Sequence, residues 1–322
     1  MHPGGHRKPG HGGEQTMIEG ILHPLITPFD EEGEVDERVL RDLLDGAIEA
    51  GVHGFFLLGS QGQGPALTYQ ERARVAQVGI EHVGGRVPVI IHVGTTDLRS
   101  TLDLARHAEA DGADAIAVIP PYYYTDHLPD EIDAHFLGVA REVGLPMVVY
   151  NNPPYAGCDI TAPWLARLAG KIPSLSGIKL SYSNPVALLQ YVDAVPERVA
   201  IYSGSVVNLW GAQPWGVKGA INPPAVLYPA LAVAIWEALK AGDLEGAKEI
   251  QGRIYETARR IAALVKKFGR PVYREGLRMM GYDVKVFPRW ESGELTEEAK
   301  AELEDIVTKA RIDGQAKARA VS

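Results

Sequence analysis

The sequence has almost no cysteine. Its 322 residues include a single one, Cys158, so an intrachain disulfide is excluded. This composition fits a reducing compartment, and we expect a cytoplasmic protein. No histidine that could serve as its base is assigned near Cys158, so we interpret this thiol as structural rather than nucleophilic.

Long apolar runs and clusters of basic residues are also missing. No run reaches the roughly 20 apolar residues that a membrane-spanning helix needs. The formal net charge is -9, and charges of both signs are scattered along the chain, whereas binding to phosphate backbones needs clustered Lys and Arg. We therefore expect neither a membrane nor a nucleic acid as partner.

The common nucleotide and metal motifs are absent as well. The first apolar run ends in Thr27-Pro28-Phe29, with no GxGxxG or GxxxxGKT pattern after it;. His92 ends another apolar run, but no HxxxH or HExxH spacing surrounds it;. We expect no metal site and no organic cofactor.

What the sequence does contain is an average globular composition, with 46% hydrophobic and 23% charged residues, which supports a sizeable core. Residues 1–16 are rich in Gly, His and Pro, and we expect a disordered extension there. A regular alternation of apolar and amphipathic segments fills 17–241. Strongly helical segments follow in 242–322, which predicts a separate C-terminal helical region.

Eight short apolar runs recur between longer amphipathic segments. Most have four to six residues of Val, Ile, Leu, Phe or Ala bounded by Gly, Pro or Asn, as expected for parallel strands covered on their outer face. The runs span 21–29, 54–59, 87–94, 115–121, 146–151, 175–181, 198–204 and 216–224. This pattern predicts an α/β protein, a (β/α)8 TIM barrel with a C-terminal helical appendage. A doubly wound open sheet also alternates in this way, but usually has fewer parallel strands and a glycine fingerprint.

The segments between these runs carry helix signals. Asp36 is a plausible N-cap for a helix ending before Gly51, and Thr68 with Glu71 has the spacing of a capping box;. Further helices are expected at 101–111, 129–143, 161–170, 185–195, 228–240, 243–268, 271–280 and 296–312. The segment 206–215 is short and rich in Trp and Gly, which makes its helix the weakest expectation.

Lys179 is the sharpest anomaly, because it lies inside the apolar run 175–180. A fully buried ammonium is unfavourable unless paired, and it tends to lose its proton. A neutral amine is a nucleophile that condenses with a ketone to form an imine. An outward-pointing or ion-paired lysine is the alternative. Since chemistry in such barrels sits at the C-terminal ends of the strands, where Lys179 lies, we favour the nucleophile.

Other unusual side chains follow the ends of neighbouring strands. Tyr150 ends the fifth run, so we expect it beside Lys179, where a phenol could relay protons. Three tyrosines (122–124) follow the fourth run. Ser60 lies in a glycine-rich loop whose backbone N–H groups could bind a carboxylate. Each signal is weak alone, but all converge on one end of the barrel.

These residues form motifs that resemble a known family. The motifs are GSQGQGPAL (59–67), PPYYY (120–124), YNNPPYAGCDI (150–160), SGIKLS (176–181) and YSGS (202–205). They resemble the dihydrodipicolinate synthase and N-acetylneuraminate lyase superfamily of pyruvate-dependent aldolases, from about Ile18 to about Trp290. Within it, the chain is most similar to the 2-keto-3-deoxygluconate aldolases.

The resemblance implies catalytic roles. Lys179 would form the Schiff base with pyruvate, and Tyr150 would act as general acid and base near the imine. Ser60 and Tyr123 would complete a hydroxyl relay with Tyr150. In this family Tyr123 would reach into the neighbouring subunit's site, which implies a homo-oligomer, a dimer or a tetramer.

It also implies substrate-binding residues. The backbone of Ser60 and Gln61 would hold the pyruvate carboxylate, and Ile221 would line the pocket beneath the substrate. Gly204, in the YSGS motif, and Tyr155 are expected to contact substrate too.

Four positions depart from the family pattern. Tyr155 stands where dihydrodipicolinate synthases have an arginine that grips the carboxylate of aspartate semialdehyde, and a tyrosine cannot make that bidentate pair. Gln61, Gln63 and Leu180 replace a hydroxyl and two acidic residues that are usual there. The pocket is therefore less charged, and we expect a neutral aldehyde partner.

The sequence thus predicts a Schiff-base lyase that cleaves or forms a 2-keto-3-deoxy sugar acid, with pyruvate and an aldehyde as its small-molecule partners. Alternatives within the same chemistry are dihydrodipicolinate synthase, a sialic-acid-type lyase and a hydratase-aldolase. A non-catalytic protein that binds 2-oxo acids is an alternative of another class, permitted by the changes at Gln61 and Gln63.

Overall fold

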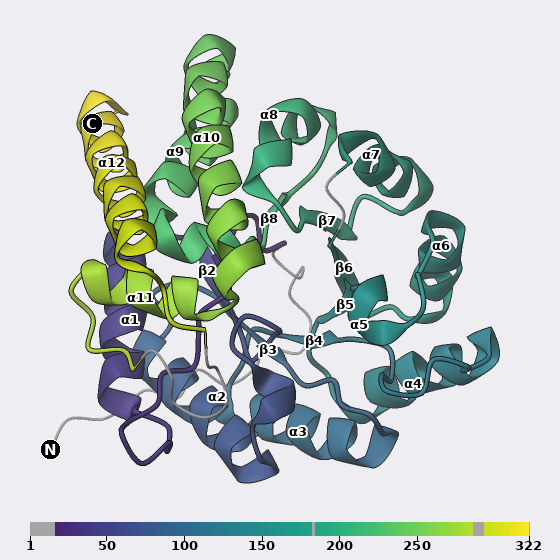
Figure 1. Cartoon of the computed structure of the whole chain (residues 1–322). Coiled ribbons are helices and arrows are strands. Elements are labelled where there is room, and N and C mark those ends of the chain that lie inside the picture. Colours follow the sequence, from purple (N-terminus) through teal and green to yellow (C-terminus); the bar gives the residue numbers. More distant parts are fainter. Residues whose placement is uncertain (1–16, 182–183, 286–292, 322) are drawn as a thin grey trace, which may run out of the picture.

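The computed structural model describes residues 17–181, 184–285 and 293–321, and within them eight parallel strands close into a barrel in chain order (Figure 1). The predicted (β/α)8 fold is therefore confirmed. The strands are β1 (Gly20–His23), β2 (Gly54–Leu57), β3 (Val89–His92), β4 (Ala115–Val118), β5 (Met147–Asn151), β6 (Leu175–Leu180), β7 (Ala200–Ser203) and β8 (Gly219–Ala220). The predicted extension at 1–16 lies outside the described residues.

Each strand is buried on both faces, which explains why its sequence is a continuous apolar run;. Alternate residues along the strands point into the barrel and form one cluster that includes Leu22, Phe56, Ile90, Val148 and Ile221. The other face of each strand packs against the helices in a second, larger cluster. The core is thus two shells of side chains separated by the barrel wall.

Every strand is shorter than its apolar run, and β1 and β8 are shortened most. Of the run 21–29, only residues 21–23 belong to β1, because Pro24 and Pro28 have no backbone N–H to donate to a neighbouring strand. The last run contributes only Gly219–Ala220, and Pro223 begins the 3₁₀ helix η4 (Pro223–Leu227).

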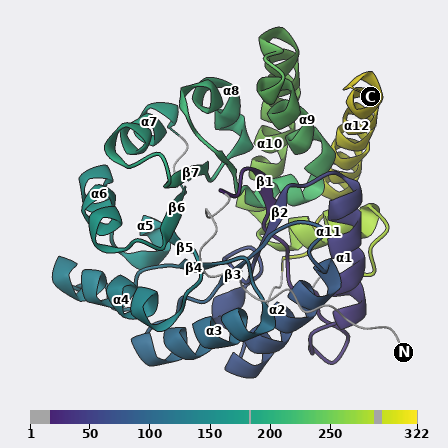
Figure 2. The same cartoon turned by 180° about the vertical axis from the view of Figure 1, so that it is seen from behind.

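A ring of helices surrounds the barrel, as the views from both ends show (Figures 1 and 2). The predicted caps are present: the Asp36 side chain accepts from Val39 N, and Thr68 and Glu71 form a capping box. The helices are α1 (Glu37–Glu49), α2 (Tyr69–Val83), α3 (Leu98–Asp111), α4 (Pro129–Glu142), α5 (Pro153–Ala156), α6 (Ala162–Lys171), α7 (Pro185–Ala194), α8 (Leu209–Ala212) and α9 (Pro229–Lys240).

Several details differ from the sequence prediction, among them the end of the last helix, which lies at Val321 rather than at residue 312. Helix α3 begins three residues earlier than expected, because the Asp97 side chain caps it by accepting from Ser100 N. The one-turn helix α5 was not predicted. The segment 206–215 is divided into the 3₁₀ helix η2 (Val206–Asn208), α8 and the 3₁₀ helix η3 (Gln213–Trp215), consistent with its weak helix signal.

The C-terminal region consists of α10 (Leu244–Phe268), α11 (Pro271–Met279) and α12 (Glu297–Val321). Helices α10 and α12 pack against each other and against α9 on one side of the barrel, while α11 lies across their ends and also contacts η4 (Figure 1). Among the residues described, no helix combines the length and hydrophobicity needed to cross a membrane.

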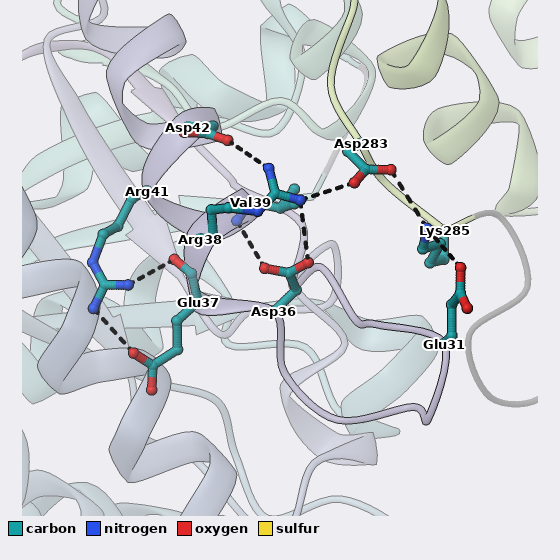
Figure 3. A network of polar contacts seen from close by, with 9 residues as sticks. All are labelled: Glu31, Asp36, Glu37, Arg38, Val39, Arg41, Asp42, Asp283 and Lys285. Atoms are coloured by element: carbon teal, nitrogen blue, oxygen red, sulfur yellow. Dashed lines mark hydrogen bonds and ion pairs between the residues drawn. The ribbon is translucent and has the colours of Figure 1, made fainter.

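An exposed ionic network joins this region to the first helix (Figure 3). Arg38 of α1 bonds Asp42 and Asp283, with Nη2 2.8 Å from Asp283 Oδ2. Lys285 then pairs with Asp283 and with Glu31. The segment that follows α11 is thereby tied to the start of α1.

Candidate active site

A cavity of about 280 Å³ opens at the C-terminal ends of the strands, and we call it the mouth cavity. Larger hollows lie elsewhere, among them one of about 960 Å³ at the opposite end of the barrel, one of about 600 Å³ beside α3 and one of about 470 Å³ beside α11 and α12. The mouth cavity is lined by Ser60, Gln63, Pro65, Ala66, His92, Ile119, Tyr122, Tyr150, Tyr155 and Arg270. It therefore gathers residues from β2 to β5 and from the start of α11.

Lys179 lies in the barrel beneath this cavity rather than in its wall. Its side chain is 2% exposed, and Nζ lies 4.4 Å from the ring centroids of both Phe56 and Tyr150. Burial lowers the pKa of the Lys179 ammonium, and the charge and hydrogen bond of Tyr150 oppose this only in part. The amine is consequently biased toward its neutral, nucleophilic form.

Tyr150 sits directly beside Lys179, because the two residues are paired in the register of β5 and β6. Its hydroxyl is 3.0 Å from Ser60 Oγ and accepts a hydrogen bond of 2.8 Å from Asn152 Nδ2. Burial alone would raise the pKa of Tyr150, but the Lys179 charge and the hydrogen bonds from Ser60, Asn152 and Ser181 together lower it. The phenol is thus prepared to release and recover a proton.

The loop after β2 brings Ser60 to this hydroxyl through an unusual backbone. Leu58 and Gln63 both have positive φ, at 63° and 55°. At Gly64, whose own φ is not positive, a side chain would overlap the Leu58 carbonyl. The loop is further held by Thr27, whose hydroxyl donates to the Gly62 carbonyl at 2.6 Å. The strain is concentrated where the loop presents Ser60, as is common at functional sites.

The other predicted substrate-binding residues are distributed differently. Tyr155 lines the rim of the mouth cavity and is 54% exposed. Gln61 and Ile221 are buried and do not line it. Gly204 is fixed by backbone bonds, since its N–H donates to the Leu180 carbonyl at 2.7 Å.

Tyr123 is not brought to Tyr150. Its side chain is 79% exposed, its φ is 83°, and its ring packs edge-on against Tyr124 with 5.1 Å between centroids. A positive φ is uncommon for a residue other than glycine, and the exposed ring of Tyr123 does not explain it by packing within this subunit.

Sequence reasoning placed His92 at a strand end that could face the barrel mouth but did not assign it to the site, and the structure places it in the wall of the mouth cavity. It is 2% exposed, and neither ring nitrogen has a well-formed hydrogen bond within the described residues. Burial, followed by the charges of Arg72 and Lys179, holds its pKa well below the ordinary value, although the Leu58 carbonyl opposes this. His92 is therefore a neutral imidazole, which both donates and accepts hydrogen bonds.

Two further residues were missed. Asn152 lies in a motif that was recognised, but its bond to the Tyr150 hydroxyl depends on side-chain geometry. Arg270 begins α11, and its Nη1 donates to the Ser60 carbonyl at 2.8 Å while Nη2 lies 3.5 Å from the Tyr155 hydroxyl. No local sequence signal indicates that a residue so far along the chain returns to the mouth cavity.

Metal-ligating side chains do not gather here. Across residues 17–181, 184–285 and 293–321, no group of three or more His, Cys, Asp or Glu side chains is arranged to hold an ion. The single thiol is unsuited to nucleophilic chemistry, because burial raises the pKa of Cys158 to about 11.

Comparison with known proteins gives consistent results. The model of the dihydrodipicolinate synthetase family matches residues 17–310. The chain is 34% identical to a 4-hydroxy-tetrahydrodipicolinate synthase of Acidiphilium cryptum, over 74% of this chain and 81% of that one. It is 31% identical to a probable 2-dehydro-3-deoxy-D-pentonate aldolase of Escherichia coli, over 90% and 97% of the two chains.

A solved structure gives the same picture. YagE, an Escherichia coli prophage protein crystallised in complex with pyruvate, superposes with a TM-score of 0.85 at 30% identity, covering 92% of this chain and 99% of YagE. Two relatives thus have names for different reactions, so the family is established more firmly than the substrate. The chain belongs to the dihydrodipicolinate synthetase family, whose members are lyases.

Proposed function

We propose that this chain is a Schiff-base aldolase that cleaves or forms a 2-keto-3-deoxy sugar acid, with pyruvate as one product. The observation that carries the proposal is the buried Lys179 amine held against the Tyr150 ring, with the Tyr150 hydroxyl bonded to Ser60 and Asn152. A nucleophilic amine and a proton-transferring phenol are the two groups that imine chemistry requires.

The reaction would begin when neutral Lys179 adds to the C2 ketone of the substrate. The carbinolamine loses water, with Tyr150 supplying a proton to the departing oxygen, and a protonated imine remains. Tyr150, now a phenolate, takes the proton of the C4 hydroxyl. The C3–C4 bond then breaks, its electrons enter the imine to give an enamine, and the aldehyde leaves.

The second half would release pyruvate. Tyr150 returns its proton to C3 of the enamine, and the resulting imine is hydrolysed by one water, which restores the free amine. Overall the sugar acid yields pyruvate and an aldehyde, with the water lost in imine formation regained at hydrolysis. Ser60 and Asn152 keep the Tyr150 hydroxyl oriented through these transfers.

The substrate carboxylate would be held by the backbone of Ser60 and Gln61. The Ser60 carbonyl is already engaged by Arg270 at 2.8 Å, which polarises the same peptide group whose N–H belongs to Gln61. A carboxylate at that N–H gains from the polarisation, because hydrogen bonds in series reinforce one another. Ile221, in the cluster that includes Phe56 and Tyr150, provides apolar packing beneath.

A dihydrodipicolinate synthase activity is the second candidate, supported by the name of the Acidiphilium cryptum relative. The residue at 155 weighs against it, because Tyr155 offers a hydroxyl where a guanidinium is expected. The sugar-acid reaction has its own support in the name of the Escherichia coli relative, which covers more of both chains. The alternative of a non-catalytic protein that binds 2-oxo acids is also compatible with Lys179, but it predicts that no substrate is turned over.

We further propose that the working unit is a homo-oligomer, a dimer or a tetramer, in which Tyr123 of one subunit enters the site of another. Its exposed ring and left-handed backbone support this assignment. Mixing K179M chains with Y123F chains tests it, because a hybrid joins an intact Lys179 to an intact Tyr123 from its neighbour. Recovery of activity above that of either variant is expected, and no recovery in verified hybrids would contradict it.

The function itself is tested in two steps. Borohydride reduction in the presence of pyruvate should add the mass of a reduced pyruvate adduct to the peptide that carries Lys179. Pyruvate release from several 2-keto-3-deoxy sugar acids is then compared with condensation of pyruvate and aspartate semialdehyde. Adduct formation without turnover would favour a binding protein, and modification elsewhere would refute the Schiff base at Lys179.

A further inference from the structure

Arg270 reaches the mouth cavity from the C-terminal region. Gly269, with φ 76° and ψ -155°, ends α10 in a conformation that favours glycine;. Pro271 then opens α11 at its first position. The chain therefore turns sharply at Arg270 and directs its guanidinium to the rim beside Tyr155.

The contacts of Arg270 leave most of its hydrogen-bonding capacity unused. One N–H donates to the Ser60 carbonyl at 2.8 Å, and the contact with the Tyr155 hydroxyl is long, at 3.5 Å. A guanidinium has five N–H donors. No ion pair to Arg270 is present in the part of the chain that the structure describes, so its charge is not neutralised there by a carboxylate.

The other arginines of α11 differ from Arg270. Arg274, one turn further on, is 2% exposed and donates to the Thr27 carbonyl and the Gln63 side chain. Arg278 is exposed and pairs with Glu275 at 3.2 Å. Of these three arginines, Arg270 alone faces the mouth cavity.

The wall of the mouth cavity offers no compensating charge. None of its ten lining residues is Asp or Glu, and His92 is neutral because its pKa lies well below the ordinary value. A half-buried cation without a counter-charge is unfavourable unless a ligand supplies one. The rim is therefore suited to an anionic group, and a guanidinium binds carboxylate and phosphate with two parallel bonds.

We propose that Arg270 binds a terminal anion, a carboxylate or a phosphate, on the aldehyde half of the substrate. This inference rests on the proposed function and narrows its substrate class to 2-keto-3-deoxy acids that carry a second anionic group at the far end. The expectation of a neutral aldehyde came mainly from the absence of an arginine at position 155. Arg270 supplies the missing guanidinium from a position 115 residues further along the chain.

The first test uses two non-cleavable 2-oxo acids of equal length, 2-oxoadipate and 2-oxohexanoate, which differ in the terminal carboxylate. The wild-type protein should bind 2-oxoadipate roughly 10- to 100-fold more tightly by calorimetry, the range for hydrogen bonds between charged groups. R270Q, whose amide keeps a donor for the Ser60 carbonyl, should lose this preference. R278Q removes a charge from the same helix outside the cavity and should retain it.

The second test identifies the anion by turnover. Condensation of pyruvate is measured with glyceraldehyde, with tartronate semialdehyde, which has a carboxylate, and with glyceraldehyde 3-phosphate. In R270Q, the ratio of kcat/KM for one or both anionic aldehydes to kcat/KM for glyceraldehyde should fall roughly 10- to 100-fold, because any effect through the Ser60 peptide is common to all three aldehydes. An equal fall for all three aldehydes, or equal binding of the two oxo acids by wild type, would overturn the role of Arg270.

The two hypotheses fail in different ways. If borohydride traps no adduct on Lys179, the proposed aldolase function is wrong, yet the calorimetric preference for 2-oxoadipate and its loss in R270Q would still support the anion site. If the adduct forms in both wild type and R270Q, but wild type prefers neither 2-oxoadipate over 2-oxohexanoate nor an anionic aldehyde over glyceraldehyde, the aldolase proposal is retained and the anion site is wrong.

Discussion

The floor and the rim of the mouth cavity are built by different means. The floor consists of Lys179, Tyr150, Ser60, Asn152 and His92, most of them on or next to strands. Lys179, Tyr150 and His92 are each 2% exposed. Because adjacent strands pair in a fixed register, the positions of these side chains are fixed by the barrel wall. Buried groups in contact also change one another's pKa, as the lysine and the tyrosine do.

The rim consists of Tyr155, Arg270 and the exposed Tyr123. It depends on loops and on the docking of α11, and Tyr155 and Tyr123 are 54% and 79% exposed. From this difference we infer that the floor, whose side chains are buried, would carry the reaction chemistry, whereas the rim would select among substrates and subunits. Substitutions in the floor should therefore change rates for every substrate, and substitutions in the rim should change preferences.

The largest effect is expected for K179M. Without the amine no imine forms, so turnover should fall by a factor on the order of 10⁴ or more, and borohydride should trap no pyruvate. Methionine keeps the length and apolar character of the side chain, so the fold should persist. Steady-state kinetics and mass spectrometry check this, and K171M, which removes an exposed lysine of α6, is the control. Substantial turnover by K179M would show that the floor does not hold the nucleophile.

Y150F should have the second largest effect. Loss of the proton-transferring hydroxyl should lower kcat by roughly 10²- to 10⁴-fold, the usual contribution of general acid and base catalysis. Imine trapping should continue, only more slowly, because Lys179 remains. Y228F is a control for the loss of a buried hydroxyl, because Tyr228 is buried, donates to Asn222 and does not line the mouth cavity.

The pH profile of Y150F gives a further check. Activity of the wild type should rise with pH as Lys179 loses its proton, starting below the ordinary pKa of lysine because burial lowers the pKa. The Tyr150 charge and hydrogen bond act to raise the Lys179 pKa, so their removal should move the rise in imine formation to lower pH. A shift to higher pH would contradict the assigned coupling.

H92F is expected to have a smaller effect. Because the His92 imidazole is neutral, buried and without a well-formed hydrogen bond, we expect it to bond a hydroxyl of the substrate. Loss of that hydrogen bond should lower kcat/KM for sugar-acid cleavage roughly tenfold. Pyruvate itself has no hydroxyl, so the rate of adduct trapping should be unchanged. H135F is the matched control, since His135 is also buried with a lowered pKa of about 4 but lies outside the cavity. Equal losses in both assays would assign His92 a structural role.

The buried Lys179 in the floor should also make the stability of the fold depend on pH. Burial lowers the pKa of Lys179 in the native state, so above that lowered pKa and up to the ordinary value the unfolded chain binds more protons. The free energy of unfolding therefore rises with pH between the lowered and the ordinary pKa of Lys179. Below the lowered pKa, the buried charge of Lys179 destabilises the native state to its full extent. K179M should raise the free energy of unfolding at neutral pH by about 1 kcal/mol or more, with the gain shrinking toward pH 10. Chemical denaturation at several pH values measures this, and a gain that grows with pH would have the wrong sign.

The sequence predicted that Tyr150 lies beside Lys179, and the register of β5 and β6 confirms it, because the determinants of this pairing are local. Continuous apolar runs indicate strands, consecutive strands become neighbours, and Lys179 and Tyr150 end two of those runs. Arg270 could not be predicted, because its place depends on how α10 turns at Gly269 and on how Arg274 fixes α11 against the loop after β2. The contact of Tyr155 with Arg270 likewise depends on tertiary structure, so position 155 in the sequence does not reveal the nearby guanidinium.

The smallest effect is expected where the C-terminal region meets α1 at the surface. Arg38 bonds Asp283 at 2.8 Å and Asp42 at 3.4 Å, but the Arg38 and Asp283 side chains are 63% and 60% exposed. Exposed ion pairs are screened by water and salt and add little to stability. R38A should therefore leave both the unfolding midpoint and kcat/KM unchanged. R274A should lower both, because it removes the buried contacts of α11 with Thr27 and Gln63. Equal destabilisation by the two variants would mean that the surface network, rather than the buried arginine, holds the rim in place.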